Sequence, residues 1–102
     1  MEQQVTAALI YDFDGTLSPG NMQEYDFIPA IGKSNKEFWH DCNELARVQD
    51  ADMTLTYMAR MIQYARSKGH SLKREAFLES GRCIALYAGV EQWFARINAY
   101  AA

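Results

Sequence analysis

The segment VTAALIYDFDGTL, residues 5–17, decides how this chain is interpreted. It begins as an apolar run rich in β-formers and ends in residues that favour a turn. That combination is typical of a buried strand in a parallel sheet. Open α/β sheets carry their reactive groups just past the carboxyl ends of such strands. Asp12 and Asp14 occupy that position in the sequence.

The spacing of Asp12 and Asp14 favours a shared cation. Side chains two residues apart on an extended segment point the same way, so both carboxylates can approach one small volume. Like charges this close are costly unless a proton or cation joins them, and Mg²⁺ is the cation that we expect. Gly15 permits a sharp turn, and its amide and that of Thr16 can form a small anion-binding nest. These groups together predict phosphoryl transfer through an aspartyl-phosphate.

The apolar run followed by Asp12-Phe13-Asp14-Gly15-Thr16-Leu17 resembles motif I of the haloacid dehalogenase-like hydrolase superfamily. The resemblance implies that Asp12 is the nucleophile and a metal ligand through its carboxylate. It implies that Asp14 is the general acid/base and a metal ligand through its backbone carbonyl, and that Thr16, beside Gly15, holds the phosphate. An acidic residue at position 14 suits phosphatases, whereas dehalogenases usually carry a non-acidic residue there. The resemblance thus implies a Mg²⁺-dependent phosphatase that acts on a small phosphorylated substrate.

Other interpretations of the same residues stay open. Asp and Gly are common in ordinary turns at strand ends, and the match can arise by chance. An EF-hand loop is a further alternative, but it would need a metal-ligating side chain where Ile10 stands and a Glu where Asn21 stands. At the level of the whole chain, the alternative is a non-catalytic helical binding or structural module in which the acidic loop is a relic.

The rest of the chain has helical patterns. Ser34 and Glu37 form a capping box that opens a helix to about Gln49. The pattern also predicts helices at 22–31, from 53 to a stop at Gly69, at 72–87 with a Ser71 cap, and from 90 onward. The methionine-rich face of the helix from 53 is more typical of core than of an adaptable binding surface. Gly81, in the middle of the helix at 72–87, predicts close packing at that point.

The predicted fold class is mainly α, with one N-terminal β-strand and four or five helices. By the resemblance, this would be a fragment of an α/β haloacid dehalogenase-like fold with a helical cap inserted after the first strand. Residues 1–21 would be the first core strand and motif I loop, 22–88 the cap, and 89–102 a helix returning toward the core. The family's phosphate-binding Ser or Thr, its basic residue and its further acidic ligands have no assignable counterpart. We therefore expect little or no turnover from the chain alone, and a possible homodimer through unpaired strand edges.

Composition narrows the class of protein. A chain of 102 residues that is 49% hydrophobic allows one domain with a modest core. Its net charge of -3 argues against a nucleic-acid partner. No signal peptide or membrane-spanning run is apparent. Cys42 and Cys83 are far apart and lack metal-ligand spacing, so we expect free thiols and a cytoplasmic location.

Overall fold

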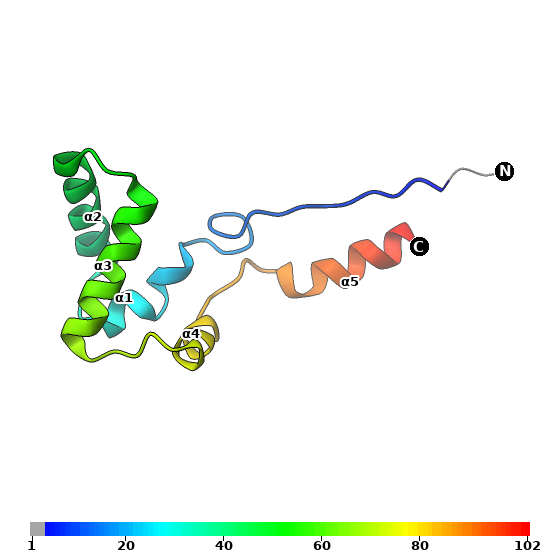
Figure 1. Ribbon diagram of the computed structural model, residues 1–102. Helices are drawn as coiled ribbons and strands as arrows, with labels where there is room; N and C mark the ends of the chain where they lie inside the picture. The colour runs from blue at the N-terminus through cyan, green and yellow to red at the C-terminus, as the bar shows by residue number, and fades with distance from the viewer. Residues whose placement is uncertain (1–3) are drawn as a thin grey trace.

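The computed structural model of the chain describes residues 4–102, which are mainly helical (Figure 1). The helices are η1 (Met22–Glu24), α1 (Phe27–Ala30), α2 (Asn35–Gln49), α3 (Met53–Lys68), α4 (Arg74–Gly81) and α5 (Val90–Ala101). η1 is a short 3₁₀-helix and the others are α-helices. The mainly helical class agrees with the sequence pattern.

The prediction of an N-terminal strand is wrong, because no strand is formed in the part of this segment that the structure describes, residues 4–12. Residues 4–12 are extended (Figure 1) but pair with no neighbour, and the β-type pairing described is an isolated bridge between Asp14 and Ser18. A strand exists only through hydrogen bonds to a second extended segment, and the element beside residues 4–12 is α5, a helix that satisfies its own backbone. No sheet is therefore present in residues 4–102, and the strand edges on which the expected homodimer depends are not formed.

Helices α2 and α3 begin and end close to where the sequence predicts. The Ser34 hydroxyl accepts from the Glu37 amide (3.1 Å), and the Glu37 carboxylate accepts from the Ser34 amide (3.4 Å), which confirms the capping box. Asp52 caps α3 by accepting from the Leu55 amide (3.0 Å). Gly69 ends α3 in the left-handed conformation, with φ 68°.

The core lies where α1, α2 and α3 meet. Its buried apolar side chains are Phe27, Ile28, Ile31, Phe38, Cys42 and Ala65. A polar group beside the core joins α2 to α3: the Tyr64 hydroxyl donates to Asp41, and Arg60 Nε lies 3.4 Å from Asp41 Oδ2. This is a small core, and it is confined to the helical part.

Helix α4 is shorter than predicted, because it covers 74–81 rather than 72–87. The Ser71 hydroxyl accepts from the Lys73 amide in a local turn and does not cap the helix. After Gly81 the chain is no longer helical, and it forms a hydrogen bond to the turn at residues 13–18. The Tyr87 amide donates to the Leu17 carbonyl (2.9 Å).

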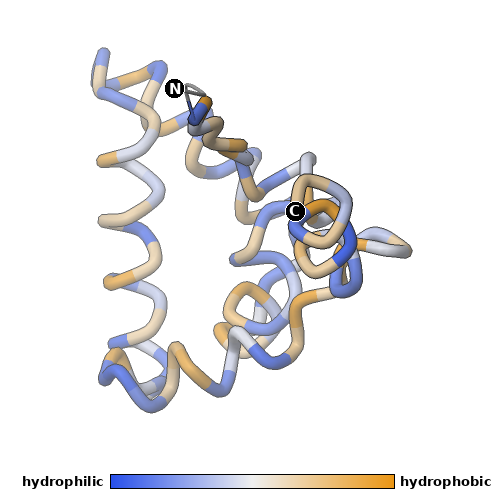
Figure 2. The backbone as a smooth tube through the Cα atoms, turned by 90° about the vertical axis from the view of Figure 1, so that its right-hand side faces the viewer, coloured by the Kyte–Doolittle hydropathy of each residue, from blue (hydrophilic) through white to orange (hydrophobic). Residues whose placement is uncertain are grey.

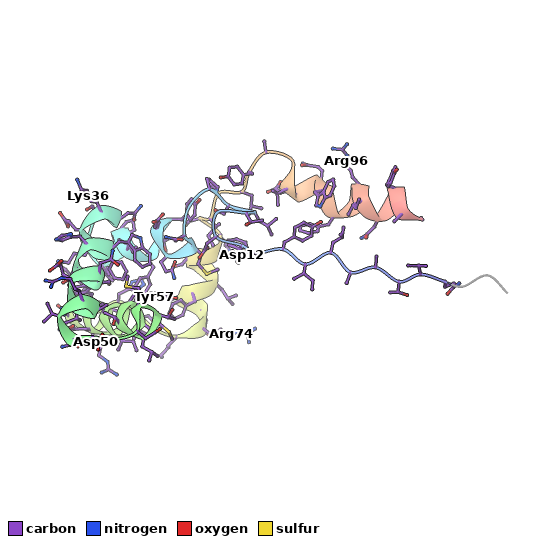
Figure 3. The ribbon with its side chains drawn as sticks, turned by 90° about the horizontal axis from the view of Figure 1, so that it is seen from above. Asp12, Lys36, Asp50, Tyr57, Arg74 and Arg96 are labelled. Atoms are coloured by element: carbon purple, nitrogen blue, oxygen red, sulfur yellow. The ribbon has the colours of Figure 1, made fainter. Side chains whose placement is uncertain are left out.

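Residues 4–12 form an arm that runs beside α5 (Figures 1 and 3). The ring of Tyr11 meets Phe94 edge to face at 5.7 Å, and the Trp93 indole N–H donates to the Tyr11 hydroxyl (2.6 Å). The radius of gyration is 18.4 Å, whereas a compact chain of this length has about 13 Å. Hydrophobic residues are spread along the described chain, residues 4–102 (Figure 2), including an arm in which Val5 is 91% and Ile10 92% exposed. The described helices include none that is long and apolar enough to span a membrane.

Candidate functional site

A tight turn at residues 13–18 holds the predicted site. The carbonyl of Phe13 accepts from the amides of Thr16 (3.1 Å), Leu17 (3.0 Å) and Ser18 (3.2 Å). Gly15 has φ 79°, a conformation that L side chains rarely adopt, although a Cβ there would meet no atom within 4 Å. The turn therefore needs Gly15 for its backbone conformation and not for space.

The amides of Gly15 and Thr16 are both used within the turn. The Gly15 amide donates to the Ser18 carbonyl (2.7 Å), and the Thr16 amide donates to the Phe13 carbonyl. In this conformation neither amide is open to an anion, so the expected nest is not formed. The Thr16 residue itself is exposed at the outside of the turn.

Asp12 and Asp14 occupy different environments. Asp12 is exposed at the base of the arm (Figure 3), and its Oδ1 accepts from the amide of Phe13 (2.9 Å). Asp14 is half-buried, and its Oδ1 accepts from the Met22 amide (3.0 Å) at the start of η1. The exposed carboxylate is accessible to a ligand, whereas the second one is fixed by the backbone.

The described residues supply a partial set of ligands for Mg²⁺. No group of three or more His, Cys, Asp or Glu side chains in residues 4–102 is arranged to hold a metal ion. Mg²⁺ in proteins commonly uses one or two carboxylates, keeps several waters and shares phosphate oxygens. Asp12 and Asp14 fit that role in number, but they would bind the ion weakly by themselves.

Ser18 and Tyr25 fix the turn and were not expected from the sequence to do so. Ser18 is fully buried, and its hydroxyl donates to the Ala85 carbonyl (2.7 Å). The Tyr25 hydroxyl lies 2.6 Å from Ser18 Oγ and accepts from the Gly20 amide (2.9 Å). Since the Ser18 proton goes to Ala85, the Tyr25 hydroxyl donates to Ser18, and the chain of bonds is complete. A Ser-Pro-Gly sequence is typical of an exposed loop, so nothing local indicated this role.

Three of the basic side chains, those of Lys33, Lys36 and Arg47, belong to the helical part. Lys33 Nζ sits 4.9 Å above the Tyr64 ring, and Arg47 pairs with Glu44 at 2.9 Å. Lys36 lies in the helical part, remote from Asp12 (Figure 3). Within residues 4–102, no ion pair joins a lysine or arginine to Asp12 or Asp14. No protein-family model, curated protein or solved structure matches the chain.

Proposed function

We propose that this chain belongs to a Mg²⁺-dependent phosphatase of the haloacid dehalogenase-like type, which acts on a small phosphorylated substrate. The observation that carries the proposal is the Asp12–Thr16 turn, in which an exposed carboxylate precedes a second one held by the Met22 amide at 3.0 Å. One residue separates the two in sequence, and a two-step transfer needs an accessible nucleophile and an acid/base held in a fixed position.

In the first step, an oxygen of Asp12 attacks phosphorus, and the bond from phosphorus to the leaving oxygen breaks. Asp14 gives its proton to that oxygen, which departs as an alcohol. In the second step, water attacks the phosphorus of the aspartyl-phosphate while Asp14 takes a proton from it. Inorganic phosphate leaves and the Asp12 carboxylate is restored. Mg²⁺ held by Asp12 and Asp14 would offset the negative charge on the phosphate.

Most of the catalytic effect in phosphoryl transfer is electrostatic stabilisation of the transferred group. Residues 4–102 offer neither a third metal ligand nor a basic side chain paired with the turn. We therefore expect little or no turnover from these residues alone. A cytoplasmic location and the absence of a nucleic-acid partner are parts of the same proposal, supported by the two free thiols and the net charge of -3.

Trp93 provides a test, because its indole donates to Tyr11 next to Asp12. In a Trp39→Phe variant it is the one tryptophan left. We expect its fluorescence to change saturably when Mg²⁺ and beryllium fluoride, a mimic of a carboxylate-bound phosphoryl group, are added together. Asp12→Asn should abolish the response. Asp50→Asn, at an exposed residue in the α2–α3 turn, should retain it.

A response that persists in Asp12→Asn, or no response, would refute the proposal. The second candidate, a non-catalytic helical module with a relic acidic loop, would then be favoured. Two observations support that candidate: no sheet forms in residues 4–102, and the Gly15 and Thr16 amides are used within the turn.

A further inference from the structure

A chain of hydrogen bonds joins Asp14 to the helical core. The Met22 amide donates to Asp14 Oδ1 (3.0 Å). The preceding residue, Asn21, donates twice to Glu24: its amide to Oε2 (3.2 Å) and its side-chain Nδ2 to Oε1 (3.2 Å). The Trp39 indole N–H donates to the same Oε1 at 2.8 Å. Glu24 therefore lies between α2 and the backbone segment that fixes Asp14.

Trp39 fixes the far end of this chain in the core. Its ring meets that of Phe38 edge to face, with centroids 5.0 Å apart, and that of Tyr57 in the same way at 5.5 Å. Phe38 is fully buried, and Tyr57 belongs to α3. Aromatic pairs of this geometry restrict the orientation of both rings. The indole N–H, and with it Glu24, is thus held relative to both α2 and α3.

The Glu24 carboxylate has neutral N–H groups as its donors. Within residues 4–102, no lysine or arginine forms an ion pair with it. Hydrogen bonds to a charged acceptor are about twice as strong as those between neutral groups. Gly20 leaves the space that this carboxylate occupies, because a Cβ at position 20 would lie 2.9 Å from Glu24 Oε2. The local backbone therefore accommodates Glu24 closely.

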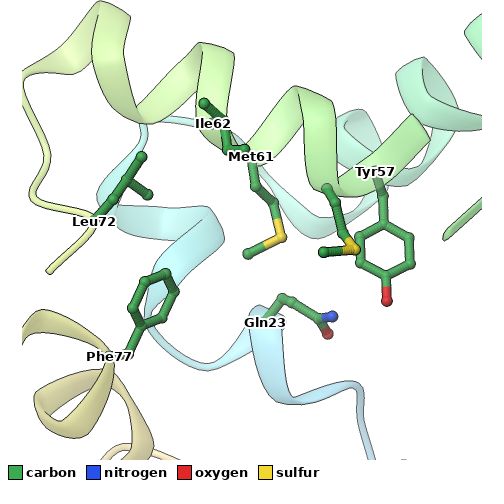
Figure 4. A pocket seen from close by; sticks show the side chains of 7 residues that line it. Gln23, Tyr57, Met61, Ile62, Leu72 and Phe77 are labelled. Atoms are coloured by element: carbon green, nitrogen blue, oxygen red, sulfur yellow. The ribbon is translucent and has the colours of Figure 1, made fainter. Parts of the chain in front are cut away.

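On its α3 side, η1 borders an open space. An apolar pocket of about 480 Å³ lies between η1, α3 and α4, with Gln23 and Met61 on its walls (Figure 4). The methionine-rich face of α3 is only partly core, since Met58 is 50% exposed and also lines this pocket. Unbranched methionine side chains change conformation at little cost. These contacts do not fix the orientation of η1, whereas the bond from Trp39 to Glu24 does.

The same bonds determine which oxygen of Asp14 carries a proton. Oδ1 accepts from the Met22 amide. A backbone N–H bonds more strongly to a bare carboxyl oxygen than to one that already bears a proton. The proton that Asp14 transfers is therefore carried by Oδ2, and it goes from there to the leaving oxygen.

We propose that Glu24 is a positioning residue for Asp14. It touches neither phosphate nor leaving group, and it acts through Asn21 and the Met22 amide. Its carboxylate holds that segment against Trp39, so that Asp14 Oδ1 stays bonded and Oδ2 is left to transfer the proton. The role in proton transfer rests on the proposed phosphatase function.

Nuclear magnetic resonance spectra of the full chain test the connection at the Met22 amide. Its proton should resonate far downfield because it is bonded to a carboxylate, and Asp14→Asn should move it upfield. Glu24→Ala should move it upfield as well and make its exchange with solvent about tenfold faster. Glu37→Ala is the matched control, because Glu37 accepts from the Ser34 amide (3.4 Å) in the same way at the start of α2. It should leave the Met22 signal unchanged, which separates positioning from a general loss of stability.

Two tryptophan variants keep the test valid if Glu24→Ala fails to fold. Trp39→Phe removes the indole N–H that bonds to Glu24, and it should make the Met22 amide exchange about threefold faster. Trp93→Phe removes an indole N–H that donates to Tyr11 in the arm (2.6 Å), and it should leave that exchange unchanged. A Met22 signal that is the same in the parent, Glu24→Ala and Trp39→Phe would overturn the proposal.

The metal-fluoride response distinguishes this proposal from the proposed function. Beryllium fluoride has no leaving oxygen, so its binding at Asp12 needs no proton from Asp14. A metal-fluoride response together with a Met22 signal that does not depend on Glu24 would leave the phosphatase function standing and overturn the role of Glu24. A Met22 signal that depends on Glu24, without a metal-fluoride response, would refute the phosphatase function and reduce Glu24 to a structural residue.

Discussion

At the scale of single residues, the polar contacts that hold the turn at residues 13–18 were the least predictable part of the site. The types and spacing of Asp12, Asp14 and Gly15 follow from local chemistry, and the positive φ of Gly15 agrees with the predicted sharp turn. The partners of Ser18 lie 7 and 67 residues away along the chain. A contact at that separation leaves no trace in the local pattern, so Ser18 had the appearance of an ordinary loop residue.

Ser18→Ala should destabilise the protein. The substitution removes the hydrogen bonds of the buried Ser18 hydroxyl to the Ala85 carbonyl and the Tyr25 hydroxyl, and each such bond contributes about 0.5–1.5 kcal/mol. Urea unfolding followed by circular dichroism measures the change. Ser67→Ala, at an exposed residue of α3, is the control and should change stability by less than about 0.5 kcal/mol. Equal effects would mean that the Ser18 bonds contribute nothing.

The pH dependence of stability should come from the α2–α3 contact. Burial, with a contribution from Asp41, raises the pKa of Cys42 from 9.0 to about 11. Burial and the hydrogen bond to Asp41 also raise the pKa of Tyr64. A group with a raised folded-state pKa stabilises fully below its unfolded value and loses that contribution as pH rises.

The free energy of unfolding should therefore be constant up to about pH 8 and fall between pH 9 and about 11. Urea titrations at several pH values measure it. In Cys42→Ala the fall should be smaller, with the Tyr64 contribution remaining. A stability that rises over this interval would contradict the assignment.

At the scale of elements, the helices that carry their own boundary signals were predictable and the strand was not. The Ser34 capping box and the Gly69 stop act within one turn of the chain, and both are confirmed. A strand requires a partner segment, which a pattern within residues 5–11 cannot reveal. The expected close packing at Gly81 is also wrong, since a Cβ there would meet nothing within 4 Å.

Two glycines at helix ends should respond oppositely to the same substitution. Gly81→Ala should stabilise α4 by about 0.5–1 kcal/mol, because the backbone is helical and the space is open. Gly69→Ala should destabilise by about 1 kcal/mol, because φ is 68° although the space is equally open. Thermal unfolding of both variants provides the comparison. The same sign in both would show that backbone conformation does not control these positions.

At the scale of the whole molecule, stability depends on one small core in an elongated chain. The principal extents are 61 × 30 × 24 Å, and the buried apolar residues all lie in α1, α2, α3 and the residue after α1. Composition allowed a modest core, but it could not indicate that the arm and α5 would stay outside it. Folding of the helical part therefore depends on few side chains.

Phe38→Ala should remove a large share of the stability of the helical part. Truncation of a buried Phe costs about 3–5 kcal/mol, and a domain of this size has about 5–15 kcal/mol in total. Phe38 is fully buried, whereas Leu78 is 56% exposed, so Leu78→Ala is the control. Urea unfolding followed by circular dichroism at 222 nm should show a much lower midpoint for the first variant and a small change for the second. Comparable midpoints for both would contradict a core centred on Phe38.

The hydrogen bonds that join Leu17 to Tyr87 and Ser18 to Ala85 have one further consequence. The chain enters and leaves the helical part at neighbouring points. Residues 19–84 therefore form an insertion whose first and last residues lie close together. Neighbouring ends are the geometry that insertion into an exposed turn of another protein requires.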